Sequence, residues 1–228
     1  MVARYVAEVR RLVPQQQQLP RPTPFIALGG WSASGILAFE AARQLQQQPG
    51  AIRVSQLIVF DSPNPIGLQN TLQRMYAFFD SLGIFGGGKT KTPEWLRAHF
   101  DAFLRILHAY KPAPLPDPPA SLVVYARDGV WKDPDGPRME TRPDDPREML
   151  WLLNNRTDFS AHGWASVLGP DKLSVRVLDE VNHFSLVDSG PKMKEMGQIV
   201  TKSLSEGIDS DSFFIFYFFP FYFLLPLY

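Results

Sequence analysis

The chain has 228 residues, no cysteine, and 23 basic residues balanced by 23 acidic ones. This length allows one domain with a sizeable core. The absence of cysteine excludes disulfides, a thiol nucleophile and thiolate metal sites, and the even spread of Lys and Arg argues against a nucleic-acid partner.

The first segment predicts a helix over residues 2–13, because its apolar residues recur at the spacing of one helical face. It contains no apolar run of signal-peptide length, so we expect a cytoplasmic protein. A polar, proline-rich connection then leads to the first predicted strand, residues 25–28.

A tight turn follows this strand and carries a serine. The sequence Gly30-Trp31-Ser32-Ala33-Ser34 separates the strand from a helix whose apolar residues recur at i, i+3, i+4 and i+7. A strand, turn and helix place Ser32 at an apex, where the helix N-terminus aims N–H groups at any oxyanion formed there. The usual motif is G-x-S-x-G, and here Gly35 comes one place late. The alternative is an exposed serine in an ordinary strand-to-helix turn.

The next strand is predicted over residues 54–60 and ends at Asp61. Residues 64–118 read as an insertion of two apolar helices joined by a glycine-rich segment. Such helices suit a lid over an apolar pocket, and the alternative is a pair of ordinary core helices.

Later elements are a strand at 122–125, a polar loop over 127–144, a helix over 145–153, a strand at 173–177 and a helix that opens at Pro191. His183 follows the last strand in a predicted loop.

The final stretch, residues 213–228, is uncharged and rich in aromatic residues. It is shorter than the roughly 20 residues that span a bilayer as a helix, and Pro220 interrupts it. We therefore expect no membrane anchor. The predicted domain covers 1–206, and 207–228 is predicted to be a non-native tail outside the fold.

A serine nucleophile needs a base that a third group holds in place. His183 is the candidate base, and the alternative is a loop histidine without a role. For the acid, the general topology of α/β-hydrolases favours Asp128, which follows the strand after the insertion. Asp61, one strand earlier, is the other candidate.

Several segments together resemble one known family. They are GGWSASGILAFEAARQL, LIVFDSPNP, TPEWLRAHFDAFLRILHAYKP, WLLNNRTDF and DEVNHFSLV, in this order from the N-terminus to about residue 205. They are similar to the thioesterase domains of fungal non-reducing polyketide synthases. The resemblance implies an α/β-hydrolase fold, with a mostly parallel sheet covered by helices on both faces. It favours Asp61 as the acid and implies release of a polyketide from an acyl carrier protein.

The resemblance also implies what the site contains. It implies a phosphopantetheine arm, which enters only as part of the carrier-bound substrate. The sequence itself contains no phosphate loop, metal-ligand spacing or dinucleotide fingerprint, so we expect no metal and no cofactor. The N–H of Ala33 is the expected oxyanion donor. A second donor normally comes from an earlier strand, and we expect this chain to lack that N-terminal part of the fold. Ser34 stands where the family has glycine, and its hydroxyl crowds the turn.

The sequence thus predicts a serine thioesterase that uses Ser32, His183 and Asp61, and that releases its acyl-enzyme by hydrolysis or Claisen-type cyclisation. A general esterase or lipase that uses Asp128 is the first alternative. A truncated fragment without catalytic activity is the second.

Overall fold

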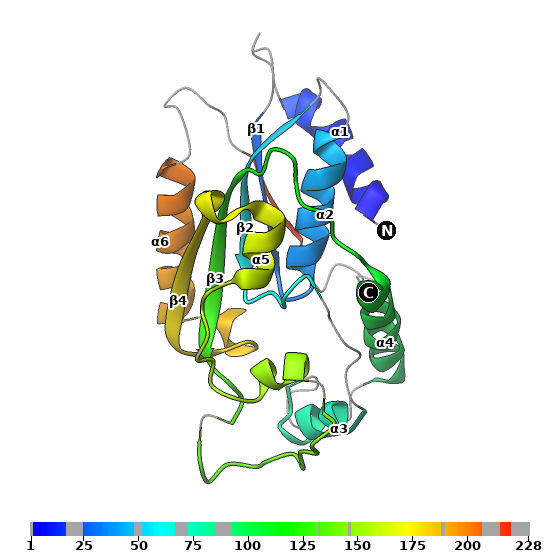
Figure 1. Cartoon of the computed structure of the whole chain (residues 1–228), viewed down its shortest axis with the longest axis vertical. Coiled ribbons are helices and arrows are strands. Elements are labelled where there is room, and N and C mark those ends of the chain that lie inside the picture. The colour runs from blue at the N-terminus through cyan, green and yellow to red at the C-terminus, as the bar shows by residue number, and fades with distance from the viewer. Residues whose placement is uncertain are drawn as a thin grey trace.

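The computed structural model describes residues 2–16, 25–47, 52–66, 73–84, 93–131, 133–145, 147–187, 190–206 and 215–219. In these residues five strands form one parallel sheet in the order β4-β3-β2-β1-β5 (Figure 1). The strands are β1 (Phe25–Trp31), β2 (Arg53–Phe60), β3 (Ala120–Asp128), β4 (Leu173–Asn182) and β5 (Ile215–Phe219). The α-helices are α1 (Val2–Gln16), α2 (Ser34–Gln46), α3 (Gln73–Ser81), α4 (Glu94–Ala109), α5 (His162–Leu168) and α6 (Pro191–Glu206).

This architecture confirms the predicted α/β class. Helix α5 was not predicted, and the strand predicted to end at Val177 continues as β4 to Asn182. The extension is irregular, because the register shifts between Ala126 and Asp128 and Glu180 has a positive φ of 64°. An apolar/polar alternation interrupted in this way gives no clear strand signal. The helix predicted over 145–153 is a 3-10 helix, Arg147–Leu152.

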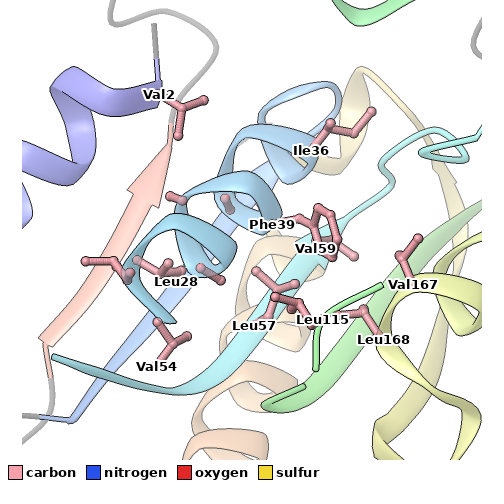
Figure 2. Packing of buried hydrophobic residues seen from close by; sticks show 14 of the residues in the cluster. Val2, Leu28, Ile36, Phe39, Val54, Leu57, Val59, Leu115, Val167 and Leu168 are labelled. Carbon is pink, nitrogen blue, oxygen red and sulfur yellow. The ribbon is translucent and has the colours of Figure 1, made fainter. Parts of the chain in front are cut away.

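Helices cover both faces of the sheet. Successive residues of a strand point to opposite faces, so each strand contributes side chains to both of the layers between sheet and helices. On β2, Leu57 and Val59 belong to the core cluster that also contains buried residues of α1, α2 and α5. Ile58 and Phe60 point the other way, into a cluster that α6 covers. Figure 2 shows the first of these layers, with Phe39 of α2 beside Val59. At β2, in the middle of the sheet, both faces are therefore covered, as in other parallel sheets.

For residues 215–219, the described part of the C-terminal stretch, the prediction of a tail outside the fold is wrong; for the rest of 207–228 it stays a prediction. Residues 215–219 form β5, which pairs in parallel with β1 from Ile26↔Ile215 to Gly30↔Phe219. An uncharged, β-prone run can satisfy backbone groups that an edge of β1 would otherwise leave unpaired. The side of β1 that faces away from β2 is therefore paired over Ile26–Gly30.

The predicted lid helices pack in two different places. Met75 and Phe79 of α3 join a cluster with Leu153, which follows the 3-10 helix. Phe103 and Leu107 of α4 join the main core instead. Within 64–118, residues 67–72 and 85–92, which include part of the glycine-rich segment, lie outside the described part of the chain. That 64–118 acts as a lid stays a prediction.

The turn between β1 and α2 depends on the missing side chain of Gly30. A Cβ atom there would lie closer than 3.0 Å to the backbone carbonyl of Ser34, in the first turn of α2. Only glycine lets the strand and the helix approach this closely. Ser34, where a serine replaces the expected glycine, is an ordinary first helical residue and is not among the described residues with positive φ.

Gly30→Ala should therefore destabilise the fold, by at least about 2 kcal/mol, because backbone rather than a flexible side chain must move. Gly197→Ala is the matched control. Nothing lies within 4 Å of a Cβ atom at Gly197, in the exposed middle of α6. This control should stabilise by about 0.5–1 kcal/mol. Urea denaturation measures both, and equal stability of the two variants would contradict the role of Gly30.

A buried carboxylate joins α2 to the end of α4. Glu40 is only 8% exposed. It accepts hydrogen bonds from Arg43 at 2.6 and 2.7 Å, from Gln44 at 2.8 Å and from the Tyr110 hydroxyl at 2.6 Å. Burial alone would raise the pKa of Glu40, but these hydrogen bonds outweigh burial and lower it. Burial, with Glu40 beside it, raises the pKa of Tyr110, which keeps the phenol a donor.

Glu40→Gln should lower the free energy of unfolding by about 2 kcal/mol at pH 7, since it removes charge-assisted hydrogen bonds. A lowered pKa stabilises the fold above the unfolded value near 4.5 and loses that effect as the pH falls through the folded pKa. The deficit of the variant should therefore shrink below about pH 4.

The control is Glu8→Gln in α1, where the same Glu–Arg pair at i, i+3 is solvent-exposed. No measurable change is expected there. The measurement is denaturant unfolding from pH 3 to pH 8, and a deficit that stays constant over this range would contradict the assignment.

Candidate active site

Ser32 occupies the apex that the sequence predicts, directly after β1. Its φ is 58°, in the left-handed region that residues with a side chain rarely adopt. Its N–H donates to the carbonyl of Phe60 at 2.9 Å, and its carbonyl accepts from Gly35 at 3.1 Å. These bonds hold the strained conformation and turn the side chain away from the strand.

Asp61 directly follows β2, the neighbouring strand, and lies in the same position relative to its strand. It too has a positive φ, 42°, and its N–H donates to the carbonyl of Val124 at 2.6 Å. The two strands pair in parallel, with Trp31 opposite Phe60, so Ser32 and Asp61 leave the sheet side by side. Asp61 is 1% exposed.

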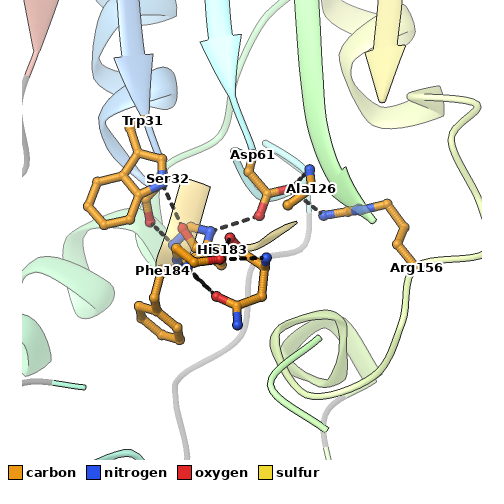
Figure 3. A network of polar contacts seen from close by, with 9 residues as sticks. Trp31, Ser32, Asp61, Ala126, Arg156, His183 and Phe184 are labelled. Carbon is orange, nitrogen blue, oxygen red and sulfur yellow. Dashed lines mark hydrogen bonds and ion pairs between the residues drawn. The ribbon is translucent and has the colours of Figure 1, made fainter. Parts of the chain in front are cut away.

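His183 links the two residues. Its Nε2 lies 3.0 Å from Ser32 Oγ, and its Nδ1 lies 2.9 Å from Oδ2 of Asp61 (Figure 3). It follows the irregular end of β4 and is 5% exposed. The structure thus brings the three predicted residues into one hydrogen-bonded row, although 151 positions separate Ser32 from His183.

The alternative acid, Asp128, lies one residue before His183 in register, but it takes part in neither hydrogen bond described for the imidazole ring. It is the last residue of β3 and pairs in register with Asn182 of β4. The carboxylate that contacts Nδ1 of His183 is that of Asp61. Ala33, whose N–H is the predicted oxyanion donor, precedes the first residue of α2 in the turn after Ser32.

Three aromatic rings, none of which was a predicted site residue, surround His183. Trp31 stacks on the imidazole at 5.0 Å between ring centroids, and its Nε1 donates to the His183 carbonyl at 3.1 Å. Trp151 and Phe184 approach edge-on at 4.9 and 5.1 Å. Trp31 lies next to the serine in sequence, which is a usable signal; Trp151 becomes a neighbour only through the fold.

Asp61 has two further partners that the sequence analysis did not identify. Its Oδ1 accepts from the backbone N–H of Ala126 at 3.1 Å and from the guanidinium of Arg156 at 3.1 Å. Figure 3 shows Arg156 reaching Asp61 from the side opposite His183. The segment WLLNNRTDF contains this arginine, but nothing in the sequence relates it to residue 61.

This row can carry out nucleophilic chemistry. With the Nδ1 proton directed at Asp61, Nε2 presents its lone pair to the Ser32 hydroxyl and can take its proton. A negative carboxylate beside Nδ1 stabilises the imidazolium that results. In the described residues, no group of three or more His, Asp or Glu side chains is placed to hold a metal ion. Nor is any helix there both long and apolar enough to cross a bilayer.

Sequence comparison gives large similarities to one class of protein. Residues 1–113 match the model of the thioesterase domain. The chain is 61% identical to a non-reducing polyketide synthase of Penicillium herquei. The aligned region of 210 residues covers 90% of the chain. The chain is also 42% identical over 213 residues, 88% of its length, to a conidial pigment polyketide synthase of Aspergillus fumigatus. The chain spans about a tenth of the length of each of these relatives.

Solved structures agree on the fold. The thioesterase domain of NocB, solved as a covalent complex with a fluorophosphonate nocardicin G analogue, has a TM-score of 0.57 at 21% identity. The similarity covers 90% of this chain and 74% of that domain. Human thioesterase 2 has a TM-score of 0.56 at 14% identity, over 92% of this chain and 83% of that one. By its sequence and its α/β-hydrolase fold, the chain belongs to the thioesterase domain family.

Proposed function

We propose that this chain is a serine thioesterase that releases a polyketide acyl chain from the thioester of an acyl carrier protein. The observation that carries the proposal is the row from Ser32 Oγ to His183 Nε2 at 3.0 Å and from His183 Nδ1 to Asp61 at 2.9 Å. The polyketide substrate is supported by the relatives, which are polyketide synthases.

In the proposed reaction, Ser32 attacks the thioester carbonyl while His183 takes the hydroxyl proton. Asp61 holds the imidazole in the required tautomer and stabilises its charged form. The N–H of Ala33 donates to the oxyanion of the tetrahedral intermediate. His183 then returns the proton to the thiolate of the phosphopantetheine arm, which leaves, and an acyl-Ser32 ester remains.

The second half of the reaction releases the acyl group. Water, activated by His183, gives a free acid, whereas a carbon nucleophile within the polyketide gives a cyclised product by Claisen-type condensation. Both outcomes use the same acyl-enzyme. The carrier protein is the proposed partner, and the cytoplasm is the proposed location.

Ser32→Ala tests the nucleophile. A fluorophosphonate probe should label the chain on Ser32, and the variant should lose the adduct. Hydrolysis of an octanoyl-N-acetylcysteamine thioester should fall by at least about 10³-fold, because binding and oxyanion stabilisation alone remain. Mass spectrometry of the digested protein and release of free thiol measure these two effects.

Ser34→Ala is the control, since Ser34 is the next serine in the chain, the first residue of α2, and is buried. It should keep both the adduct and turnover. A Ser32→Ala variant that is still labelled would refute the assignment, and a wild-type chain that is not labelled would favour the fragment without catalytic activity.

Asp61→Asn and Asp128→Asn together test the acid. An amide at residue 61 can no longer fix the tautomer of His183 or stabilise its charge, so kcat should fall by about 10⁴-fold. Asp128→Asn should change kcat by less than about threefold, since Asp61 occupies Nδ1 of His183. Steady-state hydrolysis of the same thioester measures both, and the reverse ranking would support the general esterase instead.

A further inference from the structure

Arg156 is the one cation that contacts Asp61 in the described part of the chain. Its guanidinium donates to Oδ1 at 3.1 Å, while His183 takes Oδ2. The Arg156 side chain is 16% exposed and that of Asp61 is 2% exposed. A charge pair in such a site interacts strongly because little water screens it.

Contacts of the backbone around residue 156 place Arg156 beside the site, independently of the contacts of its side chain. The N–H of Arg156 donates to the carbonyl of Arg127 at 2.7 Å, and the side chain of Asn155 accepts from the N–H of Gly129 at 3.1 Å. A Cβ atom on Gly129 would lie closer than 3.0 Å to the carbonyl of Leu153. The segment that carries Arg156 therefore runs tightly along the end of β3, next to the strand that Asp61 follows.

Two aromatic rings fix the guanidinium. Its carbon lies 4.2 Å from the ring centroid of Tyr125 and 5.0 Å from that of Trp151. Burial raises the pKa of Tyr125 to about 12, so this phenol stays neutral and offers a ring face rather than a charge. Trp151 also packs edge-on against His183. The rings limit the rotation of Arg156 and aim it at one oxygen of Asp61.

We propose that Arg156 is a positioning residue, which holds Oδ1 of Asp61 so that Oδ2 faces Nδ1 of His183. Such partners matter because a carboxylate can otherwise rotate about its Cβ–Cγ bond and turn both oxygens out of line with Nδ1 of His183. Together with the N–H of Ala126, Arg156 saturates Oδ1 and leaves Oδ2 to the imidazole. This inference rests on the proposed function, since it assigns Arg156 to the same Ser32–His183–Asp61 row.

The test uses the full chain, with the octanoyl-N-acetylcysteamine thioester as substrate. Arg156→Ala should lower kcat by about 10- to 100-fold, by analogy with outer partners of metal ligands, and leave KM within about twofold. Guanidinium chloride at about 20 mM should raise the kcat of Arg156→Ala at least about fivefold, compared with sodium chloride at equal ionic strength. Arg156→Lys should lie between the wild type and Arg156→Ala, since an ammonium restores the charge but not the planar, stacked geometry.

Arg127→Ala is the matched control. Arg127 also pairs with a carboxylate, Asp179, and also stacks on an aromatic ring, at 4.9 Å from the centroid of Phe159. Both side chains of that pair are exposed, at 46% and 60%. Arg127→Ala should leave kcat unchanged, and added guanidinium should have the same effect on it as on the wild type.

A second readout does not depend on turnover. The low-field proton resonance of His183 Nδ1–H, identified by its loss in His183→Ala, should shift or broaden in Arg156→Ala and recover with guanidinium. Circular dichroism and thermal unfolding show whether Arg156→Ala folds. If it does not, kcat and the proton resonance of His183 Nδ1–H are measured in Arg156→Lys instead.

Three results would overturn the proposal. They are an unchanged kcat with an unchanged resonance, a raised KM at constant kcat, and a loss of kcat that guanidinium does not repair in a folded variant. The second of these would mean that Arg156 binds substrate. Failure of the proposed function looks different, since wild type and Ser32→Ala would then turn over equally. The proton resonance would still decide whether Arg156 positions Asp61.

Discussion

The parallel pairing of β1 with β2 is the constraint on which the site depends. Because carboxyl ends of parallel strands meet at one edge of a sheet, Ser32 and Asp61 leave neighbouring strands at the same level. Each has a positive φ, and each is held there by a hydrogen bond from its own N–H to the next strand. The strain at the two residues is thus offset by the sheet itself, and the distance between their side chains is set by the spacing of two strands.

His183 completes the row from a third strand, and its environment is built by several elements. Trp31 comes from β1, Trp151 from the 3-10 helix, and Phe184 follows His183 itself. These rings keep the imidazole 5% exposed, which strengthens its interaction with Asp61 because less water screens it. Phe184 in turn contacts Phe79 of α3 at 5.1 Å between centroids. The predicted lid region therefore touches a residue adjacent to the base.

The edge strand β5 illustrates how backbone requirements can override an expectation from composition. The uncharged aromatic run of residues 213–228 differs in composition from the rest of the chain. Strand β1, which leads into Ser32 and pairs with β2 on one side, presents backbone N–H and C=O groups on its other side. Residues 215–219 pair with that side, from Ile26 to Gly30 of β1. β5 therefore ends its pairing one residue before Trp31 and two before the proposed nucleophile.

The sequence by itself determined the α/β class, the turn at Ser32, and the choice of Ser32, His183 and the pair of acid candidates. The α/β class follows from the family resemblance. The others follow from local patterns: a strand and a helix of different period on either side of a glycine turn, and polar residues directly after apolar strands. Residues alone left the acid open between Asp61 and Asp128, since both follow a strand.

Only the tertiary structure brought Asp61 rather than Asp128 to Nδ1 of His183, and only it related Arg156, Trp151 and Tyr125 to the site. It also revealed the irregular end of β4 and the pairing of β5. The physical reason is common to all of these. They depend on which strands become neighbours and in what register, and pairing between segments far apart in the chain leaves no period or motif in the sequence of either one.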